Sequence, residues 1–239
     1  MSQLNLSSEF MQYLVSYCGD PNIDNCDTVQ LPPLNQLSKE LGVSVAGLRE
    51  QLEVAEALGL VEVKPRIGIR RLPYSFLPAV RQSLSYAVAF DQSYFSAYSD
   101  MRNHIEAAYW AEASRTLTRS DHEQLAHLMK IAWDKLRGQP IQIPHLEHRQ
   151  LHLLIYSRLA NPFVQGLLEA YWEIYEAVGL NLFADYNYLT QVWTYHQEMV
   201  DAISTGDYES GFKALVDHKD LLYHRPHLVD ESNPEFIRS

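Results

Sequence analysis

The spacing of apolar side chains in the first 73 residues predicts three short helices followed by two strands. Leucine and other apolar residues recur every three or four positions, which is typical of helices with one buried face, and then alternate as in strands. Ser7 or Ser8 is placed to cap the first helix, Ser44 to cap the third, and Gly42 to end the second. The helices are expected over 8–18, 34–41 and 45–58, and the strands over 60–63 and 67–69.

Three helices followed by a hairpin form the layout of a winged helix-turn-helix, in which the third helix enters the DNA major groove. The hairpin region supports this interpretation, because four of the chain's 19 basic residues lie within 64–71. The same layout also fits a small structural α/β subdomain. The segment Arg71-Leu72-Pro73 is a plausible joint, since proline interrupts regular structure.

From residue 74 onward the pattern predicts only helices, and no internal repeat is present. Asp121 and Asp207 are expected to cap two of them. The sequence therefore predicts a mainly α protein: a winged helix-turn-helix domain (1–73), an all-α antiparallel bundle (74–228) and a C-terminal tail (229–239). The expected helices are 76–89, 92–118, 121–136, 143–160, 163–180, 186–204 and 208–223.

Composition limits the function classes. A chain of 239 residues with 46% hydrophobic side chains can fold into one large or two modest domains. Its formal charge of −11 argues against a nucleic-acid partner, but all of this net negative charge belongs to residues 1–30 and 76–239. No run reaches the ~20 apolar residues of a membrane helix, and the N-terminus lacks a signal-peptide pattern. The two cysteines do not form a disulfide framework, which is typical of a cytoplasmic protein. Together with the absence of a membrane helix, this leads us to expect no membrane partner.

The histidines point to a metal. All ten lie at or after His104. His148 and His152 are four apart and share a helix face, while His196 and His218 belong to two other predicted helices. Four imidazoles from three helices can converge on a divalent ion in a bundle core. The alternative is four ordinary histidines that are hydrogen-bonded or face solvent.

Residues Leu31 to Gly68 resemble the DNA-binding domain of GntR-family regulators. The resemblance rests on Leu41-Gly42-Val43-Ser44, Leu48-Arg49-Glu50 and Pro65-Arg66-Ile67-Gly68. The family usually has an acidic residue and an arginine where this chain has Leu34 and Asn35, and Arg-Thr where it has Val45 and Ala46. Without one good side-chain contact to DNA, binding weakens by about 1–3 kcal/mol. The DNA-contacting positions implied by the resemblance are Asn35, Ser44, Val45, Ala46, Arg49, Lys64 and Arg66.

Residues 92–222 resemble the FCD ligand-binding domain of the FadR subfamily. Arg102 and Glu106 match the Arg-x-x-x-Glu helix of that domain. His152 matches the histidine that precedes its Asn-Pro pair, which is Asn161-Pro162 here. His196 and His218 match its two-histidine C-terminal pattern. In that domain an aspartate and three histidines often hold a metal. The implied ligands are His148, His152, His196 and His218, with His148 in the aspartate position. A neutral imidazole there favours Zn²⁺ or Ni²⁺ over Mn²⁺.

The resemblance implies a homodimer that binds an operator of two half-sites and responds to a small organic acid. The acid would bind to the metal and to Arg102, with hydroxyls from tyrosines such as Tyr186 and Tyr195. These tyrosines could equally serve core or dimer packing, and Arg102 could pair only with Glu106.

Two other function classes remain open from the residues. Leu34, Val45 and Ala46 could form an apolar patch, so that the chain acts by protein interaction in place of DNA binding. A zinc ion could also activate water in a hydrolase. Four protein ligands would leave a closed site, however, and the sequence has no nucleophile motif, so we do not expect an enzyme.

Overall fold

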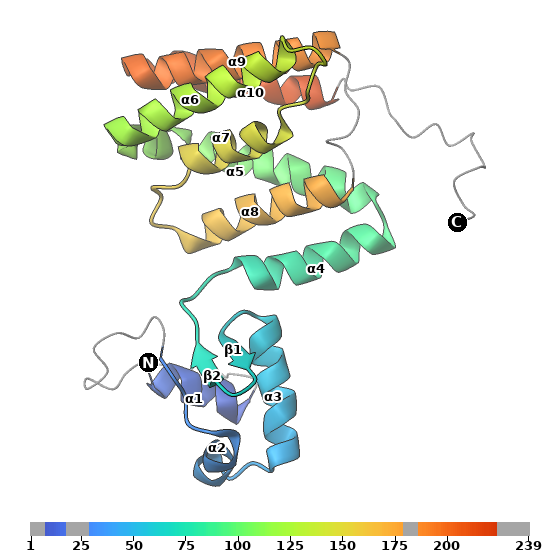
Figure 1. The fold of residues 1–239 in the computed structure, drawn as a ribbon, viewed down its shortest axis with the longest axis vertical. Coiled ribbons are helices and arrows are strands. Elements are labelled where there is room, and N and C mark those ends of the chain that lie inside the picture. The colour runs from blue at the N-terminus through green and yellow to red at the C-terminus, as the bar shows by residue number, and fades with distance from the viewer. Residues whose placement is uncertain (1–7, 18–28, 179–185, 224–239) are drawn as a thin grey trace, which may run out of the picture. The chain divides into compact units, whose positions relative to one another are not determined.

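The structure is a computed structural model that describes residues 8–17, 29–178 and 186–223 (Figure 1). These residues form ten helices and two antiparallel strands, which confirms the predicted mainly α fold. The chain divides into two compact units, residues 1–98 with 160–174, and residues 99–159 with 175–239.

The first unit begins with a three-helix head and a hairpin, close to the predicted positions. Ser44 caps the third helix by accepting a hydrogen bond from the Gly47 backbone N–H at 3.1 Å. Gly42 follows the second helix in the left-handed conformation (φ 67°), which glycine adopts without strain. The elements are α1 (Glu9–Tyr17), α2 (Leu34–Leu41), α3 (Val45–Ala57), β1 (Val61–Lys64) and β2 (Gly68–Arg71).

The hairpin strands lie one residue later than the alternation predicts, because the turn is set by backbone geometry. Arg66 adopts a positive φ of 66°, and Gly68 pairs with Lys64 at the end of the ladder. The Leu31 backbone N–H donates to the Ile69 carbonyl at 2.8 Å, so the segment before α2 also borders β2. The core of the head consists of Phe10, Leu14, Leu31, Leu37, Leu48, Leu52, Ala55, Val61 and Ile69.

Two further helices, α4 (Leu77–Phe90) and α8 (Pro162–Ala177), contribute to the first unit. Gly166 lets α8 approach the start of α4, since a Cβ there would lie 2.7 Å from the Leu77 backbone nitrogen. Gly59 is equally restricted, because its Cβ would lie 2.4 Å from Pro78 Cγ. Both glycines are therefore required by close approach.

The second unit is a helical bundle in which α9 and α10 form an antiparallel hairpin and α6 lies alongside α9 (Figure 1). The predicted cap at Asp207 is confirmed, since its carboxylate accepts from the Ser210 N–H at 3.2 Å. None of the described helices combines the length and apolar character needed to cross a membrane. The helices are α5 (Ser93–Thr116), α6 (Arg119–Leu136), α7 (His145–Ile155), α9 (Tyr186–Thr205) and α10 (Tyr208–Tyr223).

Two sequence predictions for these helices are wrong in detail. Helix α6 is capped by Thr118, whereas Asp121 occupies the third helical position and completes a capping box by accepting from the Thr118 N–H at 2.8 Å. Helix α7 ends at Ile155 instead of residue 160. The Asn161 side chain accepts from the Phe163 N–H at 3.0 Å and caps α8, so the chain leaves the helical path before it.

Candidate functional site

The four histidines that the sequence singles out lie together in the second unit. His148 and His152 come from α7, His196 from α9 and His218 from α10. Each offers a ring nitrogen, and these four atoms all lie within 4.8 Å of one another. The Nε2 atoms of His152 and His196 are 3.1 Å apart.

Helix geometry and packing explain this convergence. The four-residue spacing in α7 puts His148 and His152 on one face, and the α9–α10 hairpin presents the other two rings to it. His152, His196 and His218 are fully buried, while His148 is half-buried. Trp193 closes one side, with its ring centroid 4.9 Å from that of His196 and 6.0 Å from that of His148.

The spacing suits one metal ion. Two imidazole nitrogens bound to a tetrahedral zinc at about 2.0–2.1 Å lie about 3.4 Å apart. The 3.1 Å between the Nε2 atoms of His152 and His196 is close to that value. The other ligand nitrogens lie at most 4.8 Å apart, so the rings would need to move only slightly closer together to bind one ion. The donor set therefore fits a borderline divalent ion such as Zn²⁺ or Ni²⁺.

Burial keeps the rings in the form that binds metal. It lowers the pKa of His152 and of His196 well below the ordinary value, and nearby positive groups add to the effect. Burial also lowers the pKa of His218 to about 3; His152 and Arg102 lower it further, and Glu106 opposes them. Neutral imidazoles can offer a lone pair to an ion without first losing a proton.

A buried charged pair on α5 borders the histidines. An Arg102 Nη2 atom lies 2.8 Å from Glu106 Oε1, and the same carboxylate oxygen lies 3.2 Å from His152 Nδ1. Arg102 also donates to Asn103 Oδ1 at 3.2 Å. Burial raises the pKa of Glu106, while Arg102 and His218 oppose this shift.

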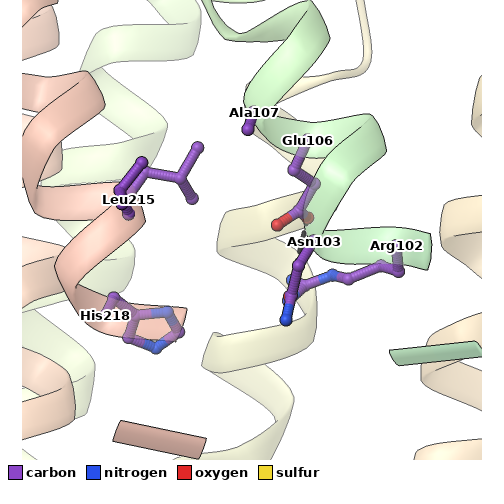
Figure 2. A pocket seen from close by; sticks show the side chains of 7 residues that line it. Arg102, Asn103, Glu106, Ala107, Leu215 and His218 are labelled. Atoms are coloured by element: carbon purple, nitrogen blue, oxygen red, sulfur yellow. Dashed lines mark hydrogen bonds and ion pairs between the residues drawn. The ribbon is translucent and has the colours of Figure 1, made fainter. Parts of the chain in front are cut away.

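Helices α5 and α10 enclose a small cavity beside this pair. Figure 2 shows His218 and Leu215 of α10 facing Asn103 and Glu106 of α5. Its volume is about 10 Å³, which is room for about one water molecule. Arg102 and His218 thus border one polar space, although that space is too small for an organic acid as it stands.

The other predicted or adjacent residues lie elsewhere. Tyr186, at the start of α9, is 45% exposed, Tyr195 is half-buried, and neither lines the cavity. Glu147 is buried but turns to Lys135, whose Nζ lies 2.7 Å from its carboxylate. Sequence reasoning did not include Asn103 or assign Glu106 a metal role, because no sequence spacing relates either residue to His152.

The residues implied in DNA binding gather on the head. Asn35, Ala46 and Arg49 are exposed, whereas Val45 is half-buried and Ser44 is engaged as the α3 cap. Leu34 packs against the core of the head, so these apolar residues do not form one exposed patch.

The hairpin supplies the remaining basic groups of the head. Lys64 is exposed at the end of β1 and pairs with Glu62 at 2.7 Å, and Arg66 is exposed in the turn. Helix α3 also exposes Glu50 and Glu53. Positive charge on this head therefore comes chiefly from the hairpin.

A winged helix-turn-helix head followed by a helical unit with a buried polar site is the architecture of helix-turn-helix transcriptional regulators that carry an effector domain. Residues 98–220 match the FCD domain model, which covers more than half of the chain. The chain therefore belongs to the FCD-domain family.

Two relatives agree with this family. The HTH-type transcriptional regulator YieP of Escherichia coli strain K12 is 26% identical over 196 residues, covering 77% of this chain and 80% of that protein. The structure of a GntR protein from Streptococcus agalactiae has the same fold, with a TM-score of 0.61, 16% identity, and coverage of 91% of this chain and 97% of that chain. Both proteins bear the names of transcriptional regulators and not of enzymes, in agreement with the function class expected from the sequence, and the second shows that this chain shares the fold of a GntR protein.

Proposed function

We propose that this regulator senses a small carboxylate in a metal-containing pocket of its FCD domain, and that it binds as a homodimer to an operator of two half-sites. The observation that carries the proposal is the four-histidine cluster beside Arg102. The ligand atoms lie within 4.8 Å of one another, and Arg102 borders the same cavity as His218.

Charge supports an anionic effector. His148, His152, His196 and His218 are neutral ligands, so a divalent ion held by them keeps its full charge, and Glu106 is already paired with Arg102. A Zn²⁺ or Ni²⁺ held there would act as a Lewis acid for one carboxylate oxygen only by expanding its coordination to a fifth ligand. Arg102 can hold the other, because a guanidinium matches a carboxylate in geometry and charge.

The small cavity explains how ligand binding can regulate. A volume of about 10 Å³ does not accept an organic acid, so the site must open to bind one. A ligand that binds only the opened state shifts the population toward it, which is the differential affinity that regulation requires. Helices α5 and α10 border the cavity and are the elements expected to move.

The head supports salt-dependent DNA binding in which the hairpin dominates. Lys64 and Arg66 suit phosphate contacts, while α3 offers Arg49 among exposed glutamates. Two such heads in a homodimer match two half-sites about one helical turn apart.

The metal half of the proposal is tested on protein purified without a histidine tag. Elemental analysis is expected to find about one Zn²⁺ or Ni²⁺ per chain, and a His152→Ala, His196→Ala variant is expected to lose it. The matched control is His104→Ala, His145→Ala, which removes two exposed rings. Equal metal content in the wild type and the first variant would refute the site.

The DNA half is tested by fluorescence anisotropy against the upstream region of the protein's own operon, over a range of salt concentrations. Binding is expected at low salt and should weaken steeply as salt rises. No binding at low ionic strength would refute this half. Titration with small carboxylates in the same assay then tests for the effector.

A further inference from the structure

We infer that Glu106 is a positioning residue for the metal centre. It holds His152 in the tautomer whose Nε2 lone pair points into the cluster, and Arg102 holds Glu106 in place. The inference rests on the metal pocket proposed above and assigns a role to a residue outside the ligand set.

The contact between Glu106 and His152 decides the tautomer. Glu106 Oε1 lies 3.2 Å from His152 Nδ1, and both side chains are fully buried. A carboxylate can only accept a hydrogen bond, and a neutral imidazole carries one N–H. The proton of His152 therefore resides on Nδ1, and Nε2 carries the lone pair that a metal requires.

Arg102 makes Glu106 a reliable acceptor. Its Nη2 atom lies 2.8 Å from the same carboxylate oxygen in an ion pair, and this positive charge favours the ionised form of Glu106, which can only accept hydrogen bonds. The position of the backbone is also fixed. The Tyr156 hydroxyl, next to the end of α7, donates to the Glu106 carbonyl at 2.9 Å and ties α5 to the segment that carries His152.

The neighbouring histidine shows what happens without such a carboxylate. His196 Nε2 lies 3.1 Å from His152 Nε2, and since His152 presents a lone pair, His196 must donate this bond in the metal-free state. Its Nδ1 has no hydrogen-bond partner among the described residues. His152 is therefore set for metal binding in advance, whereas His196 must change tautomer.

The first experiment compares Glu106→Gln with Glu147→Gln. Glu147 is a matched control because it is also a buried glutamate, and its carboxylate is engaged in an ion pair with Lys135 at 2.7 Å. An amide at position 106 can offer its NH₂ group to His152 and favour the wrong tautomer. Zn²⁺ affinity, measured by competition with a chromophoric chelator, is expected to fall about 10–100-fold in Glu106→Gln.

The control is expected to remain within about threefold of the wild type, since both variants remove one buried ion pair but only one disturbs His152. A Glu106→Gln affinity within that same threefold range, or an equal decrease in both variants, would overturn the inference. Ni²⁺ serves as a second probe in the same assay.

A second measurement needs no variant at position 106 and does not depend on metal binding. Nitrogen NMR of ¹⁵N-histidine-labelled, metal-free wild type reports which ring nitrogen carries the proton, and the His152 signals are assigned as those missing in His152→Asn. A protonated Nδ1 and an unprotonated Nε2 are expected. A proton on Nε2 contradicts the role of Glu106, even if Zn²⁺ binds. The expected tautomer without any metal binding instead refutes the proposed function alone.

Discussion

Lowering the pH from 7.5 to 5.5 is expected to destabilise the metal-free protein through its buried histidines. Burial lowers the pKa of His218 to about 3 from its ordinary 6.5, so the folded protein keeps this ring neutral at both pH values. The unfolded chain takes up a proton near pH 6.5. Because the unfolded state then binds more protons than the folded state, stability decreases as the pH falls.

The size of the effect follows from these two pKa values. Protonation of one histidine with a pKa of 6.5 stabilises the unfolded state by about 1.4 kcal/mol at pH 5.5 and by less than about 0.1 kcal/mol at pH 7.5. For a chain of this length, about 1.4 kcal/mol corresponds to a melting temperature lower by roughly 3–6 °C. His152 and His196 act in the same direction, since burial lowers their pKa values too.

The assay is thermal unfolding followed by circular dichroism, with chelator present and ionic strength constant. His218→Leu removes one titrating ring and should reduce the difference in stability between the two pH values by about 1.4 kcal/mol. His145→Gln, an exposed histidine on α7, is the control and should behave as the wild type. A melting temperature that is the same at pH 5.5 and 7.5 would refute the reasoning that these rings are buried and neutral.

Three further predictions concern other parts of the chain. Asp121→Asn should lower the free energy of unfolding by about 1 kcal/mol at pH 7, because it disrupts the α6 capping box. Since hydrogen bonds from Arg158 and from Thr118 lower the pKa of Asp121, this difference, measured by chemical unfolding, should shrink below about pH 4, and a constant difference would contradict the prediction. Gly211→Ala places a Cβ 2.6 Å from Trp110 Cζ2 and should cost about 1–3 kcal/mol, so an unchanged melting temperature would contradict the packing. Lys64→Gln and Arg66→Gln should each reduce the salt slope of DNA binding by about 1 in anisotropy titrations, whereas unchanged slopes would exclude phosphate contacts by the hairpin.

The helices could be predicted wherever one apolar face and a local cap determine them. Gly42 and Ser44 act through their own backbone conformation and side chain, so their roles in the head are visible in the sequence. The start of α6 is harder to predict because Thr118 and Asp121 are both good caps, and the reciprocal bonds between them decide which one is outside the helix.

Helix periodicity predicts only those parts of the site that lie on one helix. The spacing of His148 and His152 places both on one face, whereas His196 and His218 could be placed only on two other predicted helices, and the resemblance to FCD domains supported joining them to the first pair. The contact between Glu106 and His152 joins residues 46 positions apart, and it depends on how α5 packs against α7. No periodic pattern within one helix contains that information.

The unequal burial of the four histidines has a kinetic consequence. His152, His196 and His218 are sealed in the bundle, and His148 alone of the four is partly exposed to solvent. While the cavity between α5 and α10 stays closed, the ion proposed for this site would exchange most readily past His148, so the motion of this side chain is expected to set the residence time of the ion. Removal of metal by a chelator should be slow and independent of chelator concentration once that motion is limiting, even where the equilibrium affinity is modest.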